Sequence, residues 1–146
     1  MKITRRGLRR LIIETVTSPL RGCETCNLEV AGCHLSAEIA STPSQRKTGL
    51  MNRDRMEADT GMIFVFPRQM HHSFWMKDTR IPLSIAFIDK TGKIDSIHDM
   101  SPRSLSNTSS RILVPYALEV NKGWFDENDV RVGDNVANLP DWKLST

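Results

Sequence analysis

The chain has 146 residues, a length that suits a single domain and that needs no disulfide or metal in order to fold. Charged residues make up 25% and hydrophobic residues 39% of the chain, which excludes wholesale disorder, and no apolar stretch approaches the ~20 residues that cross a bilayer. The net charge of +3 is uneven, because residues 1–22 contain 6 basic groups and 1 acidic group, whereas the remainder contains 14 basic and 16 acidic groups. We therefore do not expect the main body of the chain to bind nucleic acid.

Residues 1–22 have the pattern of a basic amphipathic helical arm. Apolar residues recur at helical spacing from Leu8 to Val16, and basic residues occupy the opposite side of the helix. The candidate docking residues are Arg5, Arg6, Arg9 and Arg10. The arm is expected either to be a solvated extension or to dock onto an acidic partner or a larger assembly, with a targeting segment as a further alternative. Residues 1–14 also resemble a leader found on phage-type proteins, which implies a virion-type structural role.

Beyond a linker at residues 23–27, the hydrophobic pattern changes from helical spacing to alternation. This change predicts one β-rich domain over residues 28–140, followed by a tail at 141–146. Strands are predicted where apolar residues alternate or form short runs, at 33–40, 62–66, 74–76, 81–88, 93–100, 111–120 and 130–136. The turn residues Asp89 to Gly92 predict a hairpin between two of these strands. Pro115 predicts that the strand at 111–120, with Ile112 pointing inward, lies at a sheet edge or contains a bulge.

Two short helices are predicted within the domain. Thr42-Pro43-Ser44-Gln45 offers an N-cap, a proline at the first helical position and a glutamine that completes a capping box, and the helix is expected to end near Gly49. A second short helix is expected after Gly123, and the serine-rich segment 101–110 is expected to be a surface loop. Seven or eight short strands with little helix predict a mainly β fold, either a sandwich or a barrel.

Several motifs resemble, in the same order, those of the domain of unknown function 192 family. They are Gly49-Leu50-Met51-x-Arg53, Gly61-Met62-x-Phe64-x-Phe66, Phe74-Trp75-Met76-Lys77-x-Thr79-x-Ile81-Pro82-Leu83, Leu118-Glu119-x-Asn121-x-Gly123 and Val132-Gly133-Asp134. The resemblance covers about residues 28–137. It implies a β-rich domain similar to a jelly-roll sandwich, and it implies no activity. The family usually has Asn where Asp78 stands and Asp where Ser84 stands, so any ligand contact at these positions is altered here.

The cysteines offer a candidate metal site that the strand pattern argues against. The soft ligands close in sequence are Cys23, Cys26, Cys33 and His34. Alternation along a strand places Cys33 inward and His34 outward, so the two side chains do not face one ion. We therefore expect free thiols, with a zinc site or a redox pair as alternatives. The methionines together with His71 and His72 form an alternative soft copper site. No metal and no cofactor is expected.

Six residues embedded in the apolar motifs form the candidate ligand-binding site: Arg53, Trp75, Lys77, Thr79, Glu119 and Asn121. Trp75 and Lys77 share a face if they lie on a strand, and an exposed aromatic ring beside a cation is typical of a surface that binds a small ligand. The alternative is structural. In that interpretation Arg53 or Lys77 pairs with Glu119, which lies at a solvated strand position, and the pair braces the loops.

The sequence contains no nucleophile elbow, phosphate loop or dinucleotide fingerprint. We therefore expect a non-catalytic module that binds a small molecule or a protein partner, in a soluble protein of the cytoplasm or of a larger assembly. Two alternatives stay open. One is a structural or assembly protein that docks through residues 1–22, and the other is an enzyme of unknown reaction that acts through Glu119 and Lys77.

Overall fold

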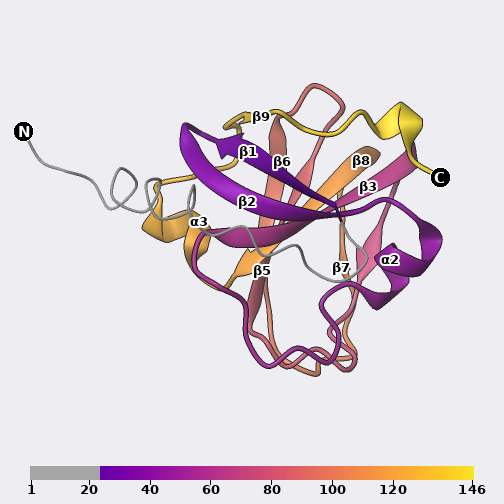
Figure 1. The fold of residues 1–146 in the computed structure, drawn as a ribbon, viewed down its shortest axis with the longest axis vertical. Helices are drawn as coiled ribbons and strands as arrows, with labels where there is room; N and C mark the ends of the chain where they lie inside the picture. The colour runs from indigo at the N-terminus through magenta and orange to yellow at the C-terminus, as the bar shows by residue number, and fades with distance from the viewer. Residues whose placement is uncertain (1–23) are drawn as a thin grey trace, which may run out of the picture.

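The computed structural model describes residues 24–146, which form one curled seven-stranded sheet, a two-stranded ribbon and short helices (Figure 1). The sheet order is β6-β5-β8-β3-β2-β1-β9, and neighbouring strands are antiparallel except for the parallel pair β2 and β3. The strands are β1 (Thr25–Val30), β2 (Cys33–Ala40), β3 (Thr60–Met70), β5 (Leu83–Ile88), β6 (Ile94–Met100), β8 (Val114–Asn121) and β9 (Val136–Ala137). The ribbon pairs β4 (Ser73–Phe74) with β7 (Thr108–Ser109). The arm predicted at residues 1–22 and Cys23 lie outside the described residues.

The two ends of the sheet approach each other. An isolated antiparallel bridge joins Lys93, just before β6, to Asn135, just before β9. The amide of Gly133 also donates to the carbonyl of Ile94 at 2.8 Å. The mainly β prediction is therefore confirmed, whereas the jelly-roll arrangement implied by the family resemblance is not confirmed. No helix within residues 24–146 is long and apolar enough to span a membrane.

Both faces of the sheet are buried. Tyr116, Leu118 and Val120 of β8 point into one core, which also contains Trp124 and Phe125. The other face packs a second core, whose largest members include Met62, Phe64, Leu83, Ile85 and Phe87. Because β8 lies between β5 and β3 and is covered on both sides, all of its residues except the last are buried. Any polar side chain on the central strands therefore has to find a partner or lose its charge.

The structure corrects several strand predictions. Pro115 lies on the central strand β8, so the edge alternative is wrong. The bulge alternative is confirmed, since the pairing register between β3 and β8 shifts between Val65 and Met70, opposite Pro115. Ile112 is exposed rather than inward, because β8 begins only at Val114. The hairpin expected around Asp89 to Gly92 is confirmed by the antiparallel pairing of β5 with β6.

The helices follow their sequence signals closely. Helix α2 (Pro43–Thr48) has the predicted capping box, in which the Thr42 hydroxyl accepts from the Gln45 amide at 3.2 Å and the Gln45 side chain accepts from the Thr42 amide at 3.2 Å. The helix ends at Gly49, which has a φ of 48°. Helix α3 (Trp124–Glu127) follows Gly123, as predicted. A short 3-10 helix (Trp142–Leu144) lies in the segment expected to be a tail.

The close approach of β3 and β8 generates a prediction about Gly61. A Cβ atom at this position would lie 2.5 Å from the backbone oxygen of Glu119, and backbone cannot move away as a side chain can. We expect Gly61→Ala to lower the free energy of unfolding by about 1–3 kcal/mol, the usual cost of overpacking a core. Urea unfolding followed by circular dichroism measures it, with Asn27→Ala on the exposed part of β1 as the control. Unfolding of Gly61→Ala at the wild-type urea concentration would contradict the packing described here.

Candidate functional site

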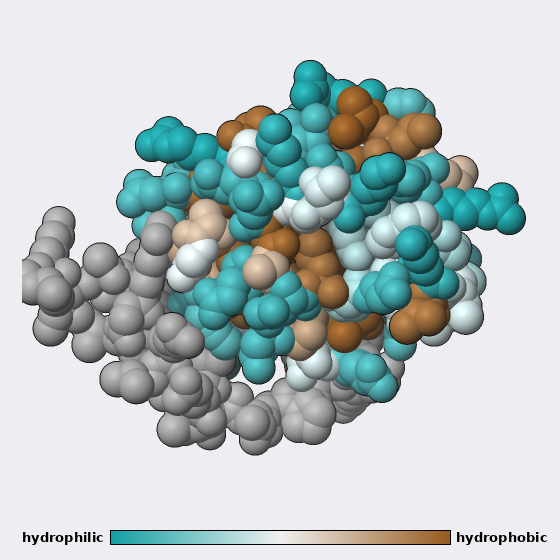
Figure 2. Space-filling model, turned by 90° about the horizontal axis from the view of Figure 1, so that it is seen from above, coloured by the Kyte–Doolittle hydropathy of each residue, from teal (hydrophilic) through white to brown (hydrophobic). Residues whose placement is uncertain are grey.

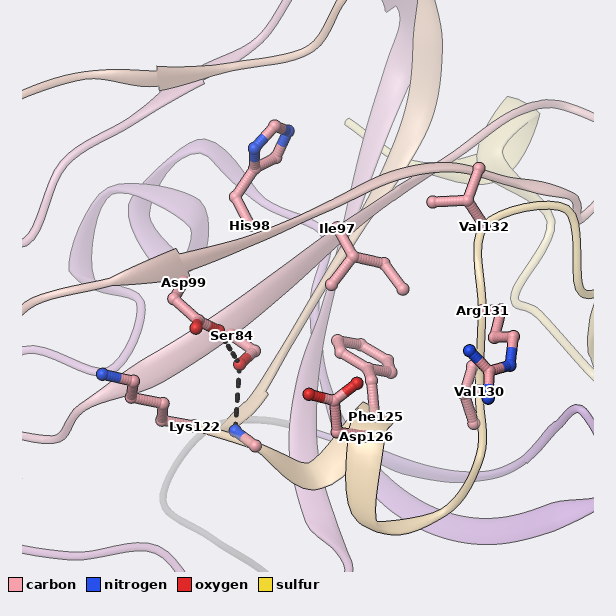
Figure 3. A pocket seen from close by; sticks show the side chains of 11 residues that line it. Ser84, Ile97, His98, Asp99, Lys122, Phe125, Asp126, Val130, Arg131 and Val132 are labelled. Carbon is pink, nitrogen blue, oxygen red and sulfur yellow. Dashed lines mark hydrogen bonds between the residues drawn. The ribbon is translucent and has the colours of Figure 1, made fainter.

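A cleft opens at the end of the sheet where β5, β6 and α3 meet (Figure 3). It has a volume of about 520 Å³. We call it the Ser84 cleft. Its walls come from β5 and β6, from the turn between β8 and α3, and from the loop after α3; they are formed by Ser84, Ile97, His98, Asp99, Lys122, Gly123, Phe125, Asp126, Val130, Arg131 and Val132. This volume lies within the range of about 300–1,000 Å³ that is typical of small-molecule sites.

Ser84 connects the three elements of the cleft. Its hydroxyl donates to Oδ1 of Asp99, its cross-strand neighbour on β6, at 2.7 Å and accepts from the Gly123 amide at 3.1 Å (Figure 3). Only 2% of the Ser84 surface is exposed. Because the hydroxyl is engaged in both directions, it positions Asp99 and the start of α3. A buried hydroxyl that already donates to one partner and accepts from another is not free to attack a substrate.

The cleft has an apolar floor and a charged rim. Phe125 and Val130 are buried and belong to the first core, and the indole N–H of Trp124 fixes α3 by donating to Asp59 at 2.8 Å. Asp126 and Arg131 are exposed on the rim. With the residues of 24–146, neither of these two side chains forms a hydrogen bond or an ion pair. A ligand entering the cleft would therefore meet both charges uncompensated.

Two of the predicted site residues lie together on another part of the surface. Nζ of Lys77 lies 5.4 Å from the centroid of the Trp75 ring, and 47% of the Trp75 surface is exposed. A strand was predicted at 74–76, but β4 ends at Phe74. Trp75 and Lys77 therefore lie on the loop after β4. Thr79, on the same loop, is buried and donates to the carbonyl of Lys77 at 3.2 Å. Lys77 thus covers the ring of Trp75 through a cation–π contact.

The predicted brace to Glu119 is wrong. Arg53 binds Glu38 through both guanidinium nitrogens, at 2.5 and 2.9 Å, and only 3% of Glu38 is exposed. Lys77 contacts Trp75 instead. Asn121 donates its amide to the carbonyl of Met56 at 3.0 Å. The contacts of Arg53 and Asn121 fix loops against the sheet, and the contact of Lys77 lies within one loop. None of them involves the Glu119 carboxyl.

Glu119 occupies a buried position that sequence reasoning placed in solvent. It lies between Ile85 of β5 and Met62 of β3 on the face of the second core, and only 5% of it is exposed. No residue of 24–146 gives its carboxyl a hydrogen bond or an ion pair. Burial raises the pKa of Glu119 to about 8, because the charged form loses its water without gaining a partner. The side chain is therefore mainly protonated at neutral pH.

Two of the three thiols, Cys26 and Cys33, lie among the described residues, and both are at least partly buried. Cys33 is buried, where its Sγ lies 3.5 Å from the Asn128 carbonyl, and burial raises the pKa of Cys26 to about 11. A high pKa keeps a thiol in its unreactive protonated form. His34 points to the face opposite Cys33, as the alternation predicted. Within residues 24–146, no three His, Cys, Asp or Glu side chains gather in a way that could hold a metal ion.

Sequence reasoning did not identify most of the Ser84 cleft. Ser84 was noted as a departure from the family pattern, and the structure places it at the centre of the cleft. Asp99, Asp126 and Arg131 gave no signal, because they are distant in the chain and lie in ordinary polar segments. Asp78 is the other position where this chain departs from the family pattern, and its φ is 55°. Asn and Asp both tolerate this left-handed conformation, so the backbone accounts for the residue type at position 78.

The comparisons with known proteins find an uncharacterised family, a proposed regulator and a protein of unknown function. The model of the domain of unknown function 192 family, described as an uncharacterized ACR, matches residues 26–138. A proposed transcription regulator from Sinorhizobium meliloti is 36% identical with a TM-score of 0.73, over 82% of this chain and 96% of that one. A protein of unknown function from Novosphingobium aromaticivorans is 26% identical with a TM-score of 0.77, over 83% of this chain and 90% of that one. No curated protein matches the chain.

The buried carboxyl of Glu119 predicts an unusual dependence of stability on pH. The pKa of Glu119 is about 8 in the folded state and 4.5 ordinarily. Between these two pH values the folded protein keeps a proton on the carboxyl, whereas the unfolded chain has released it. The Glu119 carboxyl is therefore expected to lower the free energy of unfolding as pH rises from about 4.5 to 8, by up to about 1.4 kcal/mol per pH unit.

Glu119→Gln is expected to remove this slope, since glutamine stays neutral. Urea unfolding at about pH 5 and about pH 8.5 should show similar stability for variant and wild type at the lower pH and a more stable variant at the higher pH. Glu57→Gln is the matched control, because 75% of the Glu57 side chain is exposed. Parallel profiles for wild type and Glu119→Gln would show that the carboxyl is ionised in the folded protein.

Proposed function

Because the chain belongs to the domain of unknown function 192 family, whose description names no activity, we propose from the geometry that the domain is a non-catalytic module that binds a small polar molecule in the Ser84 cleft. The observation that supports this proposal is the combination of an apolar floor with charged groups that have no partner. Sites for small molecules usually have this composition, in which apolar side chains supply contact area and a few polar groups orient the ligand.

Two further observations favour binding over catalysis or a broad protein interface. The Ser84 hydroxyl is buried and already bonded to Asp99 and Gly123, so it is not free to act as a nucleophile. On the face in Figure 2, the described residues are mostly hydrophilic, and hydrophobic residues reach the surface in separate patches. Obligate protein interfaces are larger and more continuous apolar surfaces.

The other function classes have weaker support. The similar Sinorhizobium meliloti protein is described as a proposed transcription regulator, but the body of this chain has 14 basic and 16 acidic residues, a balance that does not favour binding to a phosphate backbone. The assembly role expected from residues 1–22 rests on residues outside the described part of the chain. The Trp75–Lys77 contact stays a second candidate surface, because 47% of the Trp75 surface is exposed.

Chemical-shift mapping tests the proposal. The ¹⁵N-labelled full chain is titrated with pools of small polar fragments, and the resulting shift changes are assigned to residues. We expect the largest changes at the amides of 97–99, 123–126 and 130–132, since these segments form the walls of the cleft. Changes centred on Trp75 and Lys77, or no fragment that moves the amides of the cleft, would overturn it.

A pair of variants separates the two surfaces. Val132→Trp puts a large ring into the mouth of the cleft from an exposed position, so it should abolish the shifts at the cleft while the fold is kept. Trp75→Ala removes the aromatic ring of the second surface and should leave those shifts unchanged. If Val132→Trp unfolds the protein, Val132→Phe gives the same test with a smaller side chain. The reverse result, loss of binding with Trp75→Ala alone, would move the site to the second surface.

A further inference from the structure

Four charged side chains line the Ser84 cleft, and all of them are exposed: Asp99, Lys122, Asp126 and Arg131. Asp126 lies within α3 next to Phe125, and Arg131 comes from the loop after the helix. In Figure 3 the Phe125 ring lies between Ser84 and Arg131, with the Asp126 carboxylate beside the ring. The two side chains do not pair with each other, although both are exposed on the same rim. Opposite charges are thus held apart across an apolar surface.

The remaining charged groups of the cleft are engaged or turned away. The Asp99 carboxylate already accepts from Ser84 at 2.7 Å. The ammonium of Lys122 points away from Asp126 and Arg131 in Figure 3. Asp126 is therefore a carboxylate with no hydrogen-bond partner within residues 24–146, available to a cationic group, and Arg131 is a guanidinium equally available to an anionic group. A guanidinium suits a carboxylate in particular, because its planar donors match both carboxylate oxygens.

An apolar group fits the space between these two charges. Phe125 and Val130 form the floor, and Ile97 of β6 lies above the ring in Figure 3. Only 2% of Phe125 and 3% of Val130 are exposed. The apolar surface that a ligand can cover therefore belongs mainly to half-buried Ile97 and to Val132, of which 58% is exposed. The volume of about 520 Å³ leaves room for more than one aliphatic or aromatic side chain.

We propose that the Ser84 cleft binds a zwitterionic ligand of the amino-acid type, a free amino acid or a dipeptide with apolar side chains. Its ammonium pairs with Asp126, its carboxylate pairs with Arg131, and its side chain packs on Ile97 and Val132. This inference rests on the proposed function and specifies the chemical class of ligand. The energetic reason is that an exposed, unpaired charge costs little in the free protein, and a ligand that bridges both charges gains two charge-assisted hydrogen bonds.

Calorimetric and chemical-shift titrations of the full chain with L-leucine and with L-leucyl-L-leucine test this inference. At least one of the two is expected to bind and to move the amides of 123–126 and 130–132. Binding of L-leucine alone assigns the cleft to free amino acids, and binding of the dipeptide alone assigns it to short peptides. N-acetyl-L-leucine lacks the ammonium and L-leucinamide lacks the carboxylate, so each is expected to bind at least about tenfold more weakly than L-leucine or the dipeptide.

Single charge-removing variants complete the test. Asp126→Asn and Arg131→Gln should each weaken binding by about tenfold or more, the usual effect of losing one charged hydrogen-bond partner. Asp129→Asn is the matched control, because Asp129 is an exposed acid just after α3 that does not line the cleft, and its φ of 56° also suits Asn. Equal binding of the blocked analogues, or equal losses in all three variants, would overturn the assignment.

The titrations also separate this inference from the proposed function. If polar fragments move the amides of the cleft and neither zwitterion does, the ligand class is wrong and the binding module stands. If neither fragments nor zwitterions move them, the proposed function fails together with the inference.

Discussion

The burial of both faces of the central strands is the constraint on which the rest of this structure depends. Strands β5, β8 and β3 lie side by side between two cores, so a polar side chain on them cannot reach bulk water. Three residues meet this constraint in three ways. Ser84 uses its hydroxyl both as donor and as acceptor, Glu38 of the neighbouring strand β2 pairs with Arg53, and the pKa of Glu119 is raised so that its carboxyl becomes neutral. Each solution avoids an isolated buried charge.

The same constraint determines where a ligand can bind. Both faces of the central strands are packed, and the Ser84 cleft lies where these strands end and loops begin. At one such end, Ser84 and Gly123 fix α3 against β5, so that Phe125 completes the core on one side and forms the floor of the cleft on the other. The cleft is thus built on rigid elements, while its charged groups, Asp126 and Arg131, stand in solvent. A preorganised floor reduces the entropic cost of binding.

Local sequence signals predicted local structure well. The capping box at Thr42 and Gln45 and the turn before Lys93 act over a few residues, and both structures formed as predicted. Contacts between residues far apart in the chain were harder to predict. The burial of Glu119 depends on Ile85 and Met62, which flank it from two other strands, and nothing next to Glu119 in the chain reveals these neighbours. The partner of Arg53 was missed for the same reason, because Glu38 is brought to it only by the folded sheet.

The central claim is that ligands are bound where the packed strands end at the Ser84 cleft rather than on the exposed ring of Trp75. Crystals of the full chain soaked with a library of small polar fragments test this claim directly, since electron density locates each fragment. The account predicts fragment density that recurs between Phe125, Asp126 and Arg131. Density that gathers over Trp75 and Lys77, with the cleft holding only solvent, would contradict it.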